Sequence, residues 1–176
     1  MRLPESRFKL TLLTTVAAFC AAIAVCQVFE WLGFPEQDQV KVIKRMAGWN
    51  TDFILTVVQV LFLMPPLEEF LFRYLLFRLP SRLAAEEGSS RLFVYRPSFL
   101  IAVFSSAVFS FAHYVDYQRI FSGRGFGMLP ISNAFLALFG LGLVWCWLYR
   151  RTGRIWCNML SHSLFNAINL VLALVL

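Results

Sequence analysis

The sequence predicts an all-α protein, a polytopic bundle of about five transmembrane helices. Of its 176 residues, 59% are hydrophobic and 15% are charged, whereas about 25% are charged in an ordinary soluble domain. With this composition, a soluble domain of this length would have too few polar residues to cover its exterior. The same apolar content excludes a disordered chain. Five long apolar stretches, separated by polar connections, complete the prediction.

Each apolar stretch approaches the length that a transmembrane helix needs, about 20 mostly apolar residues. The expected spans are residues 10–34, 53–79, 98–115, 131–149 and 155–176. The first span is long and follows a short basic segment, so we interpret it as an uncleaved signal anchor rather than a cleaved signal peptide. We therefore divide the chain into an N-terminal anchor helix with its loop, residues 1–52, and a membrane core, residues 53–176.

The Lys and Arg residues of the connections predict an orientation in the membrane. The side that holds the N-terminal tail carries about twice as many of them as the opposite side, and basic loops favour the cytoplasm. We therefore expect a cytoplasmic N-terminus. The net charge of +6 then belongs to loops that face anionic lipid headgroups, so the expected partner is the lipid bilayer and no nucleic acid. The four cysteines form no Cys-x-x-Cys pair, so neither a zinc knuckle nor a disulfide framework is predicted.

Three ionisable residues lie inside the second expected span, where Glu68, Glu69 and Arg73 follow a Pro65-Pro66 step. Charged groups in hydrocarbon cost at least ~2.5 kcal/mol each on insertion scales, so they are candidates for function. The four-residue spacing lets Glu69 and Arg73 pair, whereas Glu68 points about 100° away and lacks that partner. A buried carboxylate without a cation suits a general base. We expect the proline step to kink the helix and free backbone carbonyls.

The same spacing of charges occurs a second time, at Glu86, Glu87 and Arg91. Gly and Ser separate these charges within a polar connection, so this copy is predicted to be a solvated loop. The pattern by itself is therefore a weak signal. The first copy gains its functional weight from its place among apolar helical residues.

The two histidines of the chain lie in two further expected spans. His113 follows Phe109 by four residues and His162 precedes Asn166 by four, so each pair shares a helix face. Taken alone, each histidine is explained by packing or by hydrogen bonds that hold helices together. Together with Glu68, these residues form the set needed to activate water and to stabilise an oxyanion.

The three patterns, in this order and on separate expected spans, resemble the motifs of the CPBP family of intramembrane proteases. That family includes the CAAX prenyl endopeptidases and bacterial Abi-type membrane proteins, and its motifs are Glu-Glu-x-x-x-Arg, Phe-x-x-x-His and His-x-x-x-Asn. The resemblance extends over about residues 53–172. One departure is Tyr74, where many bacterial members have glycine.

The resemblance implies that residues 53–176 form a catalytic core that hydrolyses a peptide bond in a membrane-associated protein or peptide. It implies that Glu68 and His113 activate the attacking water. It further implies that His162 and Asn166 hold the oxyanion of the tetrahedral intermediate. The residues expected to support the site are Glu69, Arg73 and Phe109.

A metal site is the alternative reading of the same residues. Glu68, His113 and His162 could supply three ligands, the number typical of catalytic zinc. No His-Glu-x-x-His motif is present, however, and the three residues come from three separate helices. The resemblance implies a glutamate-type enzyme, so we expect no cofactor, with zinc at these three residues as the alternative.

Two other functions compete with proteolysis. One is a non-catalytic membrane immunity or scaffold protein of the same fold, whose polar residues only tie helices together. The other is a small proton-conducting membrane protein in which Glu68 and the histidines relay protons, although no inverted repeat of the kind found in transporters is visible. The short chain resembles bacterial members most, so we expect a bacterial inner membrane. The candidate substrates are prenylated CAAX peptides, bacteriocin leaders and C-terminal membrane sorting tails.

One geometric difficulty follows from the expected spans. Counting about 1.5 Å per residue from their inner ends places His162 about 10 Å deep, Glu68 about 15 Å and His113 about 22 Å. A single site requires these side chains to lie at one level. Straight, parallel helices are therefore inconsistent with the proposed site. Either the span limits differ by several residues, or the third span, residues 98–115, tilts or begins inside the bilayer.

Overall fold

The computed structural model describes residues 5–36, 51–83 and 97–175. Apart from one isolated antiparallel bridge between Val115 and Met128, these residues form helices and their connecting turns. The all-α prediction is therefore confirmed. The second copy of the charge pattern, Glu86, Glu87 and Arg91, lies outside the described residues.

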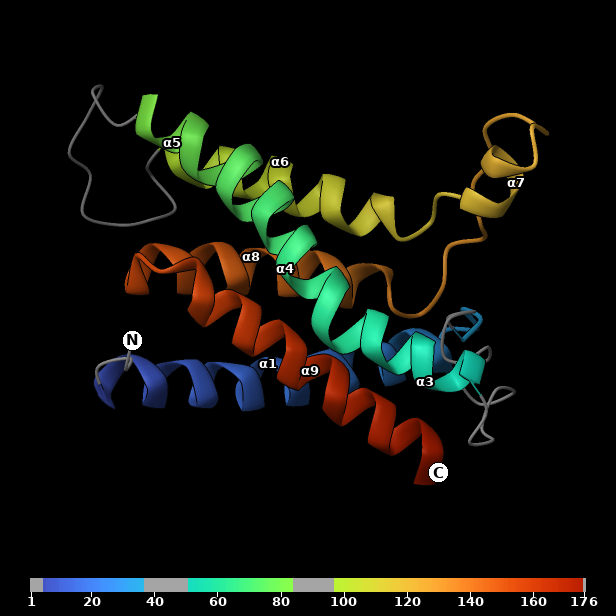
Figure 1. Ribbon diagram of the computed structural model, residues 1–176, viewed down its shortest axis with the longest axis horizontal. Helices are drawn as coiled ribbons and strands as arrows, with labels where there is room; N and C mark the ends of the chain where they lie inside the picture. The colour runs from blue at the N-terminus through green and yellow to red at the C-terminus, as the bar shows by residue number, and fades with distance from the viewer. Residues whose placement is uncertain (1–4, 37–50, 84–96, 176) are drawn as a thin grey trace.

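Five helical units follow one another through the described residues and run alternately in opposite directions (Figure 1). A short helix, α7, lies in the connection between the third and fourth units. The bounds are α1, Glu5–Trp31; the second unit with α3, Thr51–Val58, η1, Gln59–Leu63, α4, Met64–Glu68, η2, Glu69–Arg78, and α5, Leu79–Leu83; α6, Pro97–Ala112; α7, Tyr117–Phe121; α8, Phe135–Thr152; and α9, Ile155–Val175.

Two of the expected spans have different ends in the structure. The third unit, α6, ends at Ala112 rather than at residue 115, because the next three residues turn tightly through bonds to carbonyls three residues back. The fourth, α8, begins at Phe135 rather than at residue 131, because Ser132 forms a turn with the Phe135 N–H and caps Ala134 with its side chain. Both differences shorten the apolar helix at the same end of the bundle.

The helix α8 lies at the centre of the bundle and packs against α1, α6, α9 and η2. Its closest neighbour is α6, because Gly142 leaves no side chain between the two backbones. A Cβ atom at Gly142 would lie 2.7 Å from Ser106 Cβ, which is closer than packed atoms allow. The buried core around this contact consists of Ala18, Ala22, Phe72, Phe109, Ala137, Leu141, Trp145 and Leu148.

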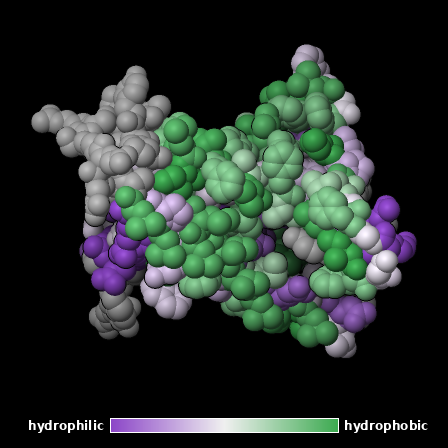
Figure 2. Space-filling view, turned by 90° about the horizontal axis from the view of Figure 1, so that it is seen from above, coloured by the Kyte–Doolittle hydropathy of each residue, from purple (hydrophilic) through white to green (hydrophobic). Residues whose placement is uncertain are grey.

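The outer surface of the bundle is apolar. Figure 2 shows hydrophobic side chains over most of the visible face, with hydrophilic side chains gathered mainly towards the two ends. Among the described helices, three are long and apolar enough to cross a membrane, Glu5–Trp31, Thr51–Leu83 and Ile155–Val175, and Ser98–Ala112 is a shorter apolar helix. An apolar exterior of this extent belongs in a lipid bilayer, because its contact with water is unfavourable and lipid tails cover it instead.

Candidate active site

Glu68 and Glu69 lie where the long second unit changes its winding. Glu68 ends the α-helical segment α4, and Glu69 begins the π-helical segment η2. A second π-helical segment, η1, precedes α4. Pro65 and Pro66 occupy the first turn of α4, so the helix continues through the proline step and changes winding there. Such π-helical insertions are rare and occur frequently at functional sites.

Asn166 supplies a hydrogen bond that the backbone of Pro65 cannot donate. In η1 the Met64 N–H bonds to the carbonyl of Gln59, five residues back. The next bond in that register would join the nitrogen of Pro65 to the carbonyl of Val60, but proline has no N–H. Asn166 Nδ2, on α9, donates to this Val60 oxygen at 3.0 Å. The amide NH₂ carries two donors, and this bond uses one of them.

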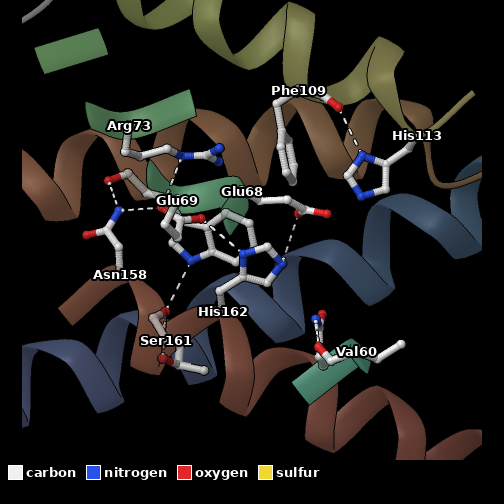
Figure 3. Close-up of polar contacts among 12 residues, drawn as sticks. Val60, Glu68, Glu69, Arg73, Phe109, His113, Asn158, Ser161 and His162 are labelled. Atoms are coloured by element: carbon white, nitrogen blue, oxygen red, sulfur yellow. Dashed lines mark hydrogen bonds and ion pairs between the residues drawn. The ribbon is translucent and has the colours of Figure 1, made fainter. Parts of the chain in front are cut away.

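Glu69 is at the centre of a sealed cluster of polar side chains (Figure 3). Arg73 Nε lies 3.4 Å from Glu69 Oε2, and both side chains are fully buried. His162 Nδ1 donates to Glu69 Oε1 at 3.0 Å, and Asn158 Nδ2 donates to Glu69 Oε2 at 3.1 Å. The expected pair of Glu69 and Arg73 is therefore present, with two further donors that stabilise the carboxylate charge.

The guanidinium of Arg73 is held mainly by aromatic faces. None of its nitrogen atoms has a hydrogen-bond partner among the described residues. Its Cζ atom lies 4.4 Å from the centroid of the Phe109 ring and 5.2 Å from that of Trp145. A cation over an aromatic face is attracted by the ring quadrupole. Phe109 thus stabilises the buried cation that balances Glu69.

Glu68 is the more accessible of the two glutamates. Its side chain is 16% exposed, whereas that of Glu69 is fully buried. His162 Nε2 lies 3.6 Å from Glu68 Oε2. The imidazole of His162 therefore bridges the two carboxylates, with Nδ1 at Glu69 and Nε2 facing Glu68. Glu68 makes no ion pair with Arg73 within the described part of the chain, as the spacing predicts.

His113 lies in the turn directly after α6, next to the same group. Its Nδ1 atom donates to the Phe109 carbonyl at 2.9 Å, so Nε2 carries the lone pair of the neutral ring. The Phe109 ring centroid lies 4.7 Å from the imidazole of His113 and 6.2 Å from that of His162. In Figure 3 the carboxylate of Glu68 lies between the two imidazoles, although no hydrogen bond or ion pair joins Glu68 and His113 in the described residues.

Two helical units of the bundle run obliquely to the others. Figure 1 shows α9 and the long second unit crossing α1 and α8 at an angle. Because these helices are tilted, residues at different distances from their helix ends can meet at one level. His162 and the two glutamates come together where α9 packs against α4 and η2, and Phe109 joins them from α6.

The motifs do not include two residues that complete the site. Asn158 is fully buried and also donates to the Trp145 carbonyl at 2.7 Å. The Trp145 ring stacks on the imidazole of His162, with centroids 4.2 Å apart and planes at 24°. A sequence signal exists for Asn158, which precedes His162 by four residues and extends the polar face of His162 and Asn166 towards the N-terminus of α9. Trp145 gives no such signal, because tryptophan in a membrane helix is commonly an interfacial residue.

The arrangement provides both parts of an acid–base site. A part-exposed carboxylate and a nearby imidazole lone pair can accept a proton from water. A second imidazole, held in orientation by a buried carboxylate, can donate to a developing negative charge. Within the described ranges, no three His, Cys, Asp or Glu side chains are placed to hold a metal ion together.

Residues 50–168 match the family described as type II CAAX prenyl endopeptidase Rce1-like. The match covers more than half of the chain and includes all three motifs. The chain belongs to this family. No curated protein and no solved structure gives a significant match. The resemblance inferred from the motifs is therefore confirmed.

As an Rce1-like protein, the chain is a member of a family of membrane-embedded proteases that act on membrane-associated peptides or proteins. The matched region begins at residue 50, so it leaves out α1. In the structure, α1 nevertheless packs directly on α8 and α9. The two helices that α1 contacts carry Trp145, Asn158 and His162.

Proposed function

We propose that the protein is an intramembrane endopeptidase in which Glu68 and His113 activate water. The observation that carries the proposal is the contrast between adjacent carboxylates. Glu69 is sealed and paired, whereas Glu68 is part-exposed beside an imidazole. Two carboxylates in different environments are suited to different tasks. The accessible one is in position to meet water, and the sealed one can only orient its neighbours.

The proposed reaction begins with proton transfer from water to the base formed by Glu68 and His113 Nε2. The water oxygen attacks the carbonyl carbon of the scissile peptide bond as its proton leaves. The tetrahedral intermediate then collapses, the C–N bond breaks, and the accepted proton passes to the departing amine. The hydrogen bond from His113 Nδ1 to the Phe109 carbonyl supports this role, because it leaves Nε2 as the acceptor.

We propose that His162 and Asn166 stabilise the oxyanion of the tetrahedral intermediate as hydrogen-bond donors. Glu69 holds His162 Nδ1–H, so a proton on Nε2 would be directed to the Glu68 side of the site. With both nitrogens protonated, His162 and Arg73 carry two positive charges against the two carboxylates, and the cluster is electrically balanced. Asn166 has one N–H bonded to the Val60 carbonyl, which orients the amide and leaves its second donor for the intermediate.

The proposal includes the class of enzyme, its location and its substrate. We propose a glutamic-type enzyme without a resident metal, in a bacterial inner membrane, with the N-terminus in the cytoplasm. The family description names CAAX prenyl endopeptidases. A peptide with a prenylated C-terminal Cys-aliphatic-aliphatic-X sequence is therefore the first substrate to test, ahead of bacteriocin leaders and membrane sorting tails.

The test compares the wild-type protein with Glu68→Gln in proteoliposomes. The probe is an internally quenched peptide with a farnesylated Cys-aliphatic-aliphatic-X terminus, and membrane proteomics of cells with either protein extends the search to other substrates. We expect cleavage by the wild-type protein only. Glu86→Gln, in the second copy of the charge pattern, is the matched control and should retain activity.

A fully active Glu68→Gln protein would exclude the proposed mechanism. If both proteins leave all substrates intact but support the same cellular phenotype, the non-catalytic scaffold function is favoured. Acidification of pyranine-loaded liposomes that depends on Glu68 would instead indicate proton conduction.

A further inference from the structure

The stacked indole of Trp145 is itself held in place by hydrogen bonds. Trp145 is 1% exposed, and its Nε1–H donates to Ser161 Oγ at 3.1 Å. Ser161 precedes His162 in the chain and is fully buried. The ring that stacks on His162 is thus tied to the turn of α9 that carries His162. This bond adds a directional restraint to the apolar packing of the indole.

The hydrogen bonds extend from Ser161 to the N-terminal helix. Thr15, on α1, has its Oγ1 atom 2.8 Å from Ser161 Oγ and 2.8 Å from the carbonyl oxygen of Thr11. Thr15 and Ser161 are 146 positions apart in the chain, and Thr15 is 2% exposed. A buried contact of this kind joins α1 to the support of the site, although α1 lies outside the region matched to the family.

One assignment of protons satisfies every donor in this set. The indole N–H donates to Ser161 Oγ, the Ser161 hydroxyl donates to Thr15 Oγ1, and the Thr15 hydroxyl donates to the Thr11 carbonyl. Each hydroxyl then donates once and accepts once, as its chemistry allows. Buried hydrogen bonds with all donors matched favour a single arrangement, because any alternative leaves a polar group unpaired in a low-dielectric interior.

Trp145 acts on the catalytic cluster from two sides. Its ring faces the imidazole of His162, and its carbonyl accepts from Asn158, which in turn donates to Glu69. Glu69 accepts from His162 Nδ1. The plane of the imidazole and the position of its carboxylate partner thus depend on the same residue. A rotation of the imidazole would move Nε2 away from Glu68.

We propose that Thr15, Ser161 and Trp145 are positioning residues that hold His162 in its catalytic orientation, so that α1 is a functional part of the site. The importance of this orientation for catalysis rests on the proposed function. The geometric part of the proposal does not, because the orientation of His162 can be observed without substrate. A misplacement of about 1 Å can cost ~10²-fold in rate, and the loss of one supporting hydrogen bond is expected to cost less.

The kinetic test uses Ser161→Ala and Thr15→Val with the farnesylated peptide in proteoliposomes. We expect kcat to fall about 10-fold with KM unchanged, because the substrate contacts are intact and only the orientation of His162 relaxes. Thr15→Ser keeps the hydroxyl and should restore the wild-type kcat. Thr14→Val is the matched control, since Thr14 is a buried neighbour on the same helix without a hydrogen bond to α9 in the described residues.

The structural test observes the imidazoles directly. The chain has two histidines, so protein labelled with ¹⁵N-histidine in nanodiscs gives two sets of imidazole signals, which His113→Gln assigns. We expect Ser161→Ala and Trp145→Phe to shift the carbon-bound proton resonances of His162, which lie under the indole ring current, and to leave those of His113 in place. Thr14→Val should shift neither.

Unchanged His162 resonances in both variants would overturn the proposal, whatever the activity. Equal kcat values in Thr15→Val, Ser161→Ala and the wild-type protein would also overturn it. The proposed function fails separately, through an active Glu68→Gln protein, and that result leaves the histidine spectra free to confirm or reject the positioning role.

Discussion

Glu68 and Glu69 are adjacent in the chain but lie in two different regions of the site. Glu69 belongs to a sealed region, where Arg73, Asn158 and one nitrogen of His162 surround its carboxylate. Glu68 belongs to an open region, which is part-exposed and faces the other nitrogen of His162. The sealed region has fixed partners for its carboxylate, whereas the carboxylate of the open region stays part-exposed. Identical side chains therefore acquire different roles from their surroundings.

The histidines repeat this difference. His162 is held by Glu69 and by the Trp145 ring, so both its direction and its plane are set by other helices. His113 is held by the carbonyl of Phe109, in the last turn of its own helix. The sealed region thus provides orientation, and the open region provides groups that can exchange protons. The following predictions test this division, in order of decreasing effect.

The largest effect is expected for Glu68→Gln. The amide keeps the size of the side chain but cannot accept the proton of water, and general-base catalysis contributes up to ~10⁴-fold. We expect peptide cleavage to fall by about 10³-fold or more, with the unfolding temperature within a few degrees of wild type. The measurement is kcat with the farnesylated peptide, paired with thermal unfolding in detergent. A loss of folding instead of activity would break the comparison.

Glu69→Gln should differ from Glu68→Gln in its effect on folding, with a large loss of stability. The substitution leaves the Arg73 guanidinium buried without its anion, and removing one partner of a buried pair costs about 3–5 kcal/mol. Chemical unfolding in micelles measures this change. The double variant Glu69→Gln with Arg73→Met removes the orphaned charge and should recover part of the stability. If Glu69→Gln unfolds like the wild-type protein, Glu69 is not the sealed member of the pair.

These two residues also show how much of the site was predictable. The sequence was sufficient to name Glu68, Glu69, Arg73, His113 and His162 as candidates, because charges and histidines are conspicuous among apolar residues. Their catalytic roles stay predictions. The all-α class followed from composition, with helix ends that differ by a few residues. The division of the chain at residue 52 remains a prediction that nothing in the structure tests.

Other features could not be read from the sequence. The Pro65-Pro66 step predicted a kink, but it predicted neither the π-helical winding on either side nor the bond from Asn166, on another helix, to the carbonyl of Val60. Thr15 gave no signal, because a threonine hydroxyl is satisfied within its own helix and its bond to Ser161 depends on how the helices pack. Contacts between helices far apart in sequence are the part of the site that only the fold determines.

Asn166→Ala is expected to have an intermediate effect, because it changes both the rate of cleavage and the stability of the helix packing. Loss of one oxyanion donor costs ~10²–10³-fold in rate, and loss of the bond to Val60 costs about 1 kcal/mol of stability. We expect kcat to fall by about 10²-fold with a small decrease in unfolding temperature. Asn169→Ala is the control, because the Asn169 amide donates to a carbonyl of its own helix. A change in stability alone would limit Asn166 to holding the helix.

Metal removal is expected to have the smallest effect. In the proposed site, Arg73 pairs with Glu69 and His162 faces both carboxylates, so the glutamates already have partners without a divalent cation. We expect exhaustive chelation to change the cleavage rate by less than about 2-fold, since general-base catalysis by a carboxylate and an imidazole needs no metal. The measurement is kcat before and after chelation, with elemental analysis of the same samples. Stoichiometric zinc, together with activity that chelation abolishes and zinc restores, would contradict the proposal. Glu68, His113 and His162 would then be assigned as metal ligands, and the open region would hold a cation.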